Sequence, residues 1–182
     1  MMSALAAFTM AVGSYWRSTS GTQCATLAAN QAVVRIQQRL ADTRRLGYCR
    51  AGGGGGAGAA IVYWPSDTNG DGQMQFTELR VLMHNPTSKT IELYVPALLG
   101  GASDSAWSVT AFRDPTAVDL LTAGQTPTTI AARVTAATFA ADQATSTTLF
   151  PTFQFWLEVE QSDGTTSNEY AAATLRSPAS PS

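Results

Sequence analysis

Residues 52–64 read GGGGGAGAAIVYW, and the hydrophobic pattern of the chain differs on the two sides of this stretch. The glycine run 52–58 has no side chains that could hold a fixed element, whereas AIVYW at 60–64 is typical of a buried strand. Before the run, apolar residues recur at helical spacing: Ala29, Val33, Ile36 and Leu40. The stretch therefore separates a helical segment from a strand-rich one.

The helical segment opens with an apolar run. Residues 1–13, MMSALAAFTMAVG, carry no charge, and the first charged side chain is that of Arg17. A run of this length is too short to span a bilayer, which takes about 20 residues. We expect one helix over residues 2–46, apolar all round at its start and amphipathic later. It should end at Gly47, because glycine readily adopts the left-handed conformation of a helix cap.

The segment after the glycine run predicts an antiparallel sheet, because stretches rich in β-branched and aromatic residues alternate with turn sequences. The expected strands cover residues 60–64, 79–84, 90–95, 107–112, 129–139, 153–161 and 169–176. One short helix is expected at 115–123. The predicted fold class is α+β, with a long N-terminal helix packed on an antiparallel β-sheet head domain.

This pattern divides the chain into segments. They are an N-terminal assembly or membrane helix at 1–46, a glycine-rich linker at 47–59, a β-rich head at 60–176 and a disordered tail at 177–182.

Composition excludes some classes of protein. Hydrophobic residues make up 45% of the 182 residues, which is enough for a core, and charged residues only 13%. The net charge of −2 offers no basic surface for nucleic acid. On a single helix Cys24 and Cys49 would lie roughly 35 Å apart. A disulfide needs Cα atoms within about 7 Å, so we expect none between them.

One segment carries specific chemistry. Residues 67–78, DTNGDGQMQFTE, match the calcium-loop pattern D-x-[DN]-x-[DN]-G-x5-E at every required position. Calcium prefers oxygen ligands, and this spacing makes them converge as the loop winds. The expected Ca²⁺ ligands are the side chains of Asp67, Asn69, Asp71 and Glu78 and the main-chain carbonyl of Gln73. The alternative is a plain turn, since Asn-Gly and Asp-Gly are common in hairpins.

The flanks of this loop predict its role. A calcium sensor has amphipathic helices on both sides of the loop, whereas here AIVYWP enters it and ELRVLMHNP leaves it. Only one copy of the loop occurs in the sequence. We therefore expect a structural calcium clip between strands.

No catalytic pattern emerges, and we expect no enzyme and no small-molecule substrate. The only histidine, His84, stands before Asn-Pro at a strand end, where an exposed or hairpin-edge position is expected. Glu158 and Glu160 alternate with apolar residues, as on a solvated strand face. The tryptophans of the strand-like runs are interpreted as core, with a carbohydrate-binding aromatic platform as the alternative: Trp64, Trp107 and Trp156.

The N-terminal sequence MMSALAAFTMAVGSYW resembles the inner part of the helix of type IV pilins and type II secretion pseudopilins. The loop DTNGDGQMQFTEL between strands is similar to pilin-like proteins of planctomycete type. Members of this class begin, after processing, with Phe-Thr-Leu-x-Glu, which this chain lacks. Two explanations are open: a start codon placed too late, at an internal methionine, or a different export route.

The resemblance implies a pilin-like fold and a non-enzymatic subunit of a pilus or pseudopilus. Its partners would be other pilin or pseudopilin subunits, contacted through the N-terminal helix, and the inner membrane before assembly. The location would be the bacterial inner membrane and periplasm or a cell-surface filament. The alternative function is a secreted calcium-binding module that binds a ligand or carbohydrate.

Overall fold

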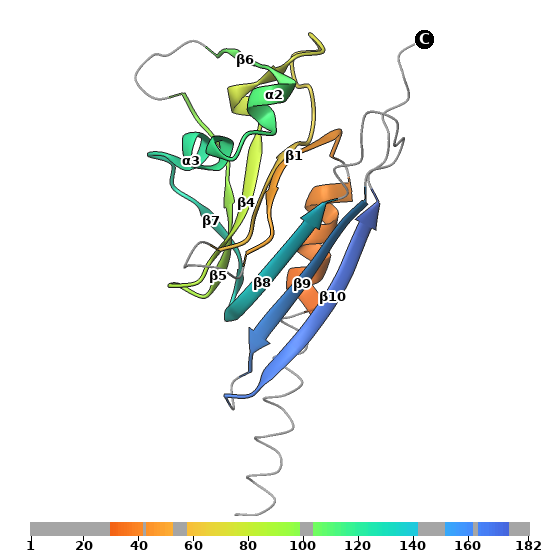
Figure 1. The fold of residues 1–182 in the computed structure, drawn as a ribbon, viewed down its shortest axis with the longest axis vertical. Helices are drawn as coiled ribbons and strands as arrows, with labels where there is room; N and C mark the ends of the chain where they lie inside the picture. The colour runs from red at the N-terminus through yellow and green to blue at the C-terminus, as the bar shows by residue number, and fades with distance from the viewer. Residues whose placement is uncertain are drawn as a thin grey trace, which may run out of the picture.

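The computed structural model describes residues 30–41, 43–52, 58–98, 104–141, 152–161 and 164–174. This part of the chain forms two main antiparallel sheets, of five and three strands, and a small sheet of two strands. In Figure 1 the smaller sheet stands in front of a helical stretch, and the larger sheet lies beside both.

The predicted fold class is wrong in its main element, the long N-terminal helix. Residues 30–41 are helical, but Thr43 is not. The last two residues of the predicted helix and the first four of the predicted linker instead form strand β1 (Arg45–Arg50), which pairs with β2 (Ala60–Trp64). Residues 2–29 of the predicted helix lie outside the described residues. The described part is a β-rich domain with short helical pieces.

A strand replaces the end of the predicted helix because side chains of residues 45–50 pack against two different hydrophobic cores. Leu46 and Cys49 pack against one hydrophobic core and Tyr48 against the other, with a bulge in the pairing between Leu46 and Cys49. Gly47 does not act as a helix cap. A Cβ at this position would lie 2.5 Å from the main-chain oxygen of Phe112, so glycine allows a close approach of two backbones.

The larger sheet has five strands in the order β1-β2-β4-β5-β7. Its remaining strands are β4 (Arg80–Asn85), β5 (Thr90–Tyr94) and β7 (Thr128–Ala132). The strands predicted at 60–64, 79–84 and 90–95 are confirmed as β2, β4 and β5. Every residue of β2 is buried, because hydrophobic cores cover both faces of the sheet.

The smaller sheet has the order β10-β9-β8, from β8 (Val134–Ala141), β9 (Thr152–Glu160) and β10 (Thr166–Thr174). The single strand predicted at 129–139 is thus two strands, β7 and β8, in different sheets. Arg133 separates them with a φ of 63°, a left-handed conformation that turns the chain from one sheet to the other. The Phe139 N–H donates to the Ala51 carbonyl (3.1 Å) and joins β8 to the end of β1.

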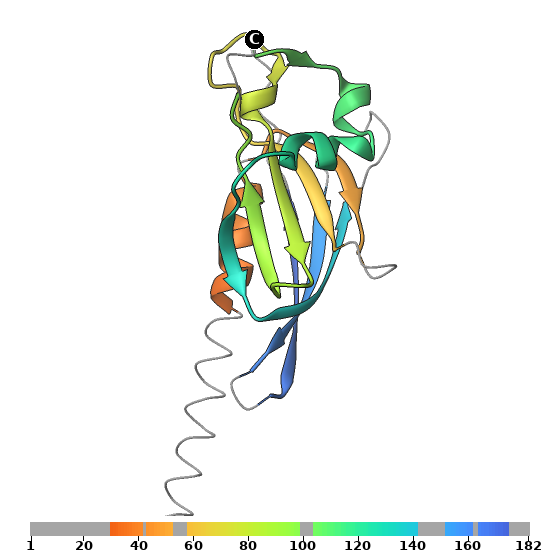
Figure 2. The same cartoon turned by 90° about the vertical axis from the view of Figure 1, so that its left-hand side faces the viewer.

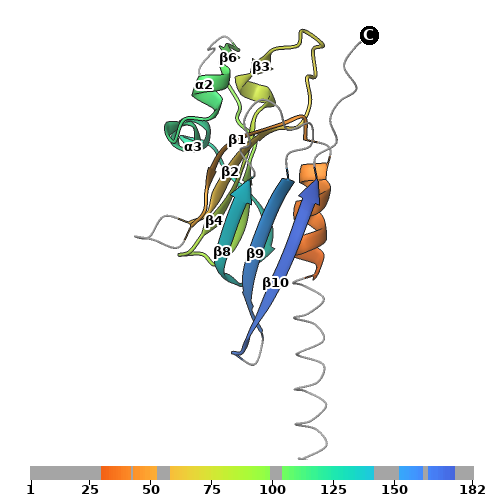
Figure 3. The same cartoon turned by 45° about the vertical axis from the view of Figure 1, so that its right-hand side comes forward.

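Helix 30–41 packs into the core shared by the two sheets through Ala32, Ile36 and Leu40, which are at most 3% exposed. Its flanks contact the strands at either side. Arg35 donates to the Ile130 carbonyl of β7 (3.1 Å), and Gln37 donates to the Ala172 carbonyl of β10 (3.1 Å). Figure 3 shows the helix alongside β10. Among the described helices, none has the length and apolar character needed to cross a membrane.

Short elements cover the other face of the larger sheet at one end (Figure 2). They are β3 (Met74–Gln75), the 3₁₀ helix η1 (Phe76–Glu78), β6 (Ala106–Trp107), α2 (Val109–Phe112) and α3 (Thr116–Thr122). The helix predicted at 115–123 is confirmed as α3. The strand predicted at 107–112 is wrong: Ser108 Oγ caps α2 by accepting the Ala111 N–H (3.1 Å), and Phe112 enters the core.

Candidate calcium loop

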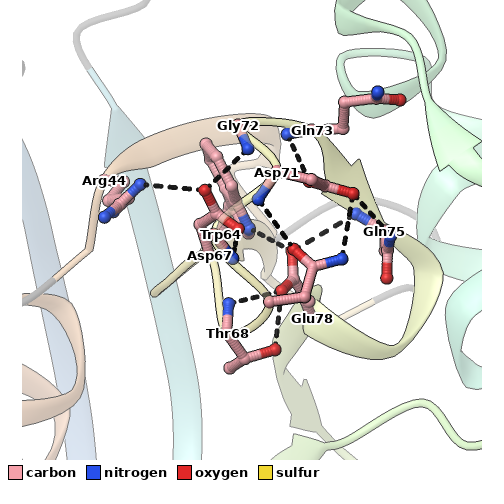
Figure 4. A network of polar contacts seen from close by, with 11 residues as sticks. Arg44, Trp64, Asp67, Thr68, Asp71, Gly72, Gln73, Gln75 and Glu78 are labelled. Carbon is pink, nitrogen blue, oxygen red and sulfur yellow. Dashed lines mark hydrogen bonds and ion pairs between the residues drawn. The ribbon is translucent and has the colours of Figure 1, made fainter.

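The predicted calcium loop leaves β2 at the end of the larger sheet and returns through β3, η1 and β4 (Figure 4). Strands β2 and β4 of the larger sheet thus hold the two ends of the loop. Met74, in its middle, is 5% exposed and packs into the core on the α2 and α3 side. The apolar residue inside the loop anchors it to the domain.

The Asp67 carboxylate holds the turn in the first half of the loop. Its two carboxylate oxygens accept the N–H groups of Gly70 and Gly72, each at 2.8 Å. Gly70 and Gly72 have φ of 75° and 74°, a region that residues with a Cβ seldom adopt. The predicted role of Gly72, which is to allow a sharp turn, agrees with this backbone conformation.

Asn69 and Asp71 continue the same winding. Asn69 Oδ1 accepts the Asp71 N–H (3.1 Å), and Asp71 Oδ1 accepts the Gln73 N–H (2.7 Å). The other Asp71 oxygen accepts the amide groups of Asn69 (2.9 Å) and Gln75 (2.8 Å). Each expected ligand side chain of this half therefore accepts N–H groups of residues that follow it in the loop, as in an Asx turn. The Gln73 side chain is exposed and points away from the network (Figure 4).

Glu78 is the buried member of the set, with 2% of its surface exposed. One oxygen accepts the N–H (2.5 Å) and the hydroxyl (2.7 Å) of Thr68. The other accepts the Trp64 indole N–H (3.1 Å) and the Gln75 N–H (3.5 Å). Burial alone would raise the pKa of Glu78, but the hydrogen bonds from Thr68, Trp64 and Gln75 outweigh it and lower the pKa below its usual value. Glu78 is therefore a carboxylate at neutral pH.

Arg44 is a neighbour of the loop that the sequence did not reveal. Its guanidinium lies 3.6 Å from Asp67 Oδ2 and 5.5 Å from the ring centre of Trp64. The Arg44 N–H donates to the Trp64 carbonyl (2.9 Å), so β1 begins beside the loop entry. Trp64 and Thr68, the donors to Glu78, were also missed, because no residue spacing encodes a contact made across a fold.

The described residues do not present a finished metal cluster. Within the described ranges, no three His, Cys, Asp or Glu side chains come together as a metal-binding group. The loop brings Asp67, Asn69 and Asp71 into successive turns, whereas the Glu78 carboxylate faces Thr68 and Trp64. The chemistry is still suitable for calcium, because the side-chain oxygens come from three carboxylates and one amide.

No protein-family model, curated protein or solved structure matches this chain. The chemistry of the residues alone therefore carries the functional argument.

The other residues with ionisable or nucleophilic side chains make contacts within the fold. His84 is buried, not exposed, and its Nε2 lies 2.9 Å from the Val134 carbonyl. Glu158 accepts the Thr135 hydroxyl (3.0 Å), and Glu160 pairs with Lys89 (2.7 Å). Burial raises the pKa of the free Cys49 thiol to about 11, which keeps it protonated and unreactive. Cys24 lies outside the described residues.

Proposed function

We propose that the protein is a non-enzymatic structural subunit whose β-rich domain is stabilised by one Ca²⁺ ion bound in loop 67–78. The observation that carries the proposal is the winding of Asp67, Asn69 and Asp71, each of which accepts main-chain N–H groups two or more residues ahead. This winding holds the three residues in successive turns of the loop without any metal. The sequence allows this winding, because glycine occupies both positions of the loop that have a left-handed backbone, Gly70 and Gly72.

Calcium would complete this loop by joining its two halves. Asp67, Asn69 and Asp71 belong to the first half, and Glu78 follows β3 in the second. For Glu78 to bind the ion with both oxygens, it must exchange hydrogen bonds from Thr68, Trp64 and Gln75 for metal bonds. Part of the binding free energy is therefore spent on this rearrangement. We expect a dissociation constant in the weak range of about 10⁻⁴–10⁻³ M, known for extracellular calcium modules.

Thermal unfolding tests this role. At calcium ten times above its dissociation constant, mass action adds about 1.4 kcal/mol, which corresponds to a rise of roughly 4 °C in the unfolding midpoint. The Asp71→Ala variant should lose this rise, since it removes a ligand that is exposed and outside the core. Asp114→Ala, which removes an exposed carboxylate away from the loop, is the matched control and should keep it. Equal midpoints in calcium and in chelator for the unmodified protein would reject calcium stabilisation.

The assembly part of the proposal rests on the apolar residues 1–16. An uncharged, largely apolar segment of this kind needs a covering of lipid or of other subunits. Among the described residues, the core takes its first helical contact from Ala32. The proposed partners are other copies or related subunits, and the proposed location is the membrane or a surface filament of a bacterium.

Deletion of residues 2–20 tests this part. We expect a folded, monomeric domain with an unchanged unfolding midpoint, whereas the full chain self-associates or partitions into detergent. Sedimentation velocity of both forms, with and without detergent, measures the difference. If the deletion unfolded the domain, or if the full chain were an equally monomeric species in plain buffer, the assembly role would be wrong.

A second candidate, a ligand- or carbohydrate-binding module, is favoured by one pair of side chains. Trp64 is buried, and Trp107 packs against Phe76 with ring centres 6.2 Å apart. Trp156, in contrast, lies beside Tyr170, which is 77% exposed, with ring centres 6.3 Å apart. Tyr170, the exposed ring of this pair, can stack on a sugar ring, with the partly buried Trp156 beside it. For a module of this kind, the 2–20 deletion would leave the oligomeric state unchanged.

A further inference from the structure

A groove of about 410 Å³ lies between helix 30–41 and strand β7. Among the described residues it is lined by Arg35, Gln38, Arg39 and Ile130. Its volume is in the range of small-molecule sites, about 300–1,000 Å³. It lies in the seam between the helix and β7, the edge strand of the larger sheet.

The helical period places the two arginines on this flank. Ile36 and Leu40 face the core, and Arg35 and Arg39 each precede one of them. Residues four apart on a helix lie on the same side, with a rise of about 6 Å between them. The guanidinium groups of Arg35 and Arg39 therefore line one wall of the groove, one turn apart.

The described charged side chains that line the groove, Arg35 and Arg39, are both positive, and neither forms an ion pair with a described acidic side chain. Arg35 Nη1 donates to the Ile130 carbonyl (3.1 Å), which fixes this side chain and leaves its other N–H groups available. Arg39 has no described acceptor for its guanidinium, since the ion pairs of the described residues involve Arg44 and Lys89. No acidic side chain among the described residues lines the groove.

We propose that this groove binds a small dianion, a phosphate or a dicarboxylate, between the guanidinium groups of Arg35 and Arg39. The planar fork of an arginine side chain can donate two parallel hydrogen bonds to an oxyanion. Gln38 adds a neutral amide at the rim, and Ile130 supplies an apolar wall for the carbon part of an organic acid. This site is independent of calcium binding and goes beyond the structural role proposed above.

Titration of the full chain with inorganic phosphate and with malonate, followed by NMR of the arginine side chains, tests the site. Sodium chloride at matched ionic strength is the control for signal shifts that arise only because added salt screens the charges of the protein. We expect saturable shifts of the Arg35 and Arg39 Nε–H signals with phosphate, malonate or both, and none with chloride. A response to phosphate alone identifies a tetrahedral anion as the ligand, and a response to malonate alone identifies a dicarboxylate.

Two variants and one matched control sharpen the test. Arg39→Gln should weaken binding at least tenfold without lowering the unfolding midpoint, because the Arg39 guanidinium has no described hydrogen bond or ion pair to lose. Arg35→Gln should weaken it as well. Arg113→Gln, an exposed arginine at the end of α2, should leave binding unchanged. Shifts that do not saturate, that chloride reproduces, or that Arg113→Gln reduces as much as Arg39→Gln would overturn the proposal.

Discussion

The Glu78→Ala variant is expected to be less stable than the unmodified protein by about 3 kcal/mol in chelator. Removing the buried carboxylate leaves four donors without their acceptor: the N–H and hydroxyl of Thr68, the indole of Trp64 and the N–H of Gln75. Each buried donor left unpaired costs about 1–3 kcal/mol, reduced where water enters. Denaturant unfolding measures the loss. Glu158→Ala, which removes a half-buried carboxylate from β9, should cost less than about 1 kcal/mol.

The lowered pKa of Glu78 adds a pH dependence with a fixed sign. A carboxyl group whose pKa is lower in the folded protein stabilises the fold above its unfolded pKa of about 4.3. That stability is lost as the pH falls through the lower folded-state pKa. The Glu78→Gln variant cannot titrate at this position, so its unfolding free energy should fall less steeply with acid. An equal loss for both proteins between about pH 5 and pH 2 would show that Glu78 makes no such contribution.

The Gly58→Ala variant should be destabilised by about 3 kcal/mol or fail to fold, because the backbone of β4 leaves no room for a side chain. A Cβ at residue 58 would lie 1.7 Å from the His84 carbonyl oxygen and 2.8 Å from its carbon. The same contact region includes the hydrogen bond from the His84 N–H to the Ala59 carbonyl (2.7 Å). The clash would therefore disrupt the pairing of β2 with β4, the two strands that hold the ends of the calcium loop.

Gly70→Ala is the control for the Gly58 variant. A Cβ at Gly70 meets nothing within 4 Å, but the φ of 75° is unfavourable for alanine. Its expected cost is about 1 kcal/mol, from backbone strain alone. Thermal or denaturant unfolding of the two variants separates a backbone collision from conformational strain. A Gly58→Ala protein as stable as Gly70→Ala would contradict the close approach at residue 58.

Much of the β-structure could be predicted from sequence because burial leaves a clear pattern there. β2 is buried on both faces and appears as the unbroken apolar run AIVYW. β9 alternates buried and less buried residues, and its expected range of 153–161 agrees with Thr152–Glu160. The end of the helix was predicted wrongly because Leu46 and Tyr48 pack against different cores, which the bulge in β1 allows, so the strand lacks the usual alternating pattern. Pairing with β2 decides the outcome, and that contact is remote in sequence.

The calcium loop could be predicted only in part for a related reason. Spacing within twelve residues reveals Asp67, Asn69 and Asp71, because their hydrogen bonds are local. The environment of Glu78 depends on the Trp64 indole, which β2 delivers from fourteen positions away. Arg44 comes from the start of β1. Such contacts follow from the packing of whole strands and leave no local signature.

The most direct measurement of the central claim is a calcium titration of the ¹⁵N-labelled protein followed by the amide signals of Gly70 and Gly72. Both N–H groups donate to the Asp67 carboxylate, so a metal bound to that carboxylate must shift both signals. Calcium binding in loop 67–78 predicts saturable shifts that fit one ion per chain, with a dissociation constant of about 10⁻⁴–10⁻³ M, and their loss in Asp71→Ala. Signals of Gly70 and Gly72 that stay unmoved at calcium concentrations of roughly ten times that range would contradict it.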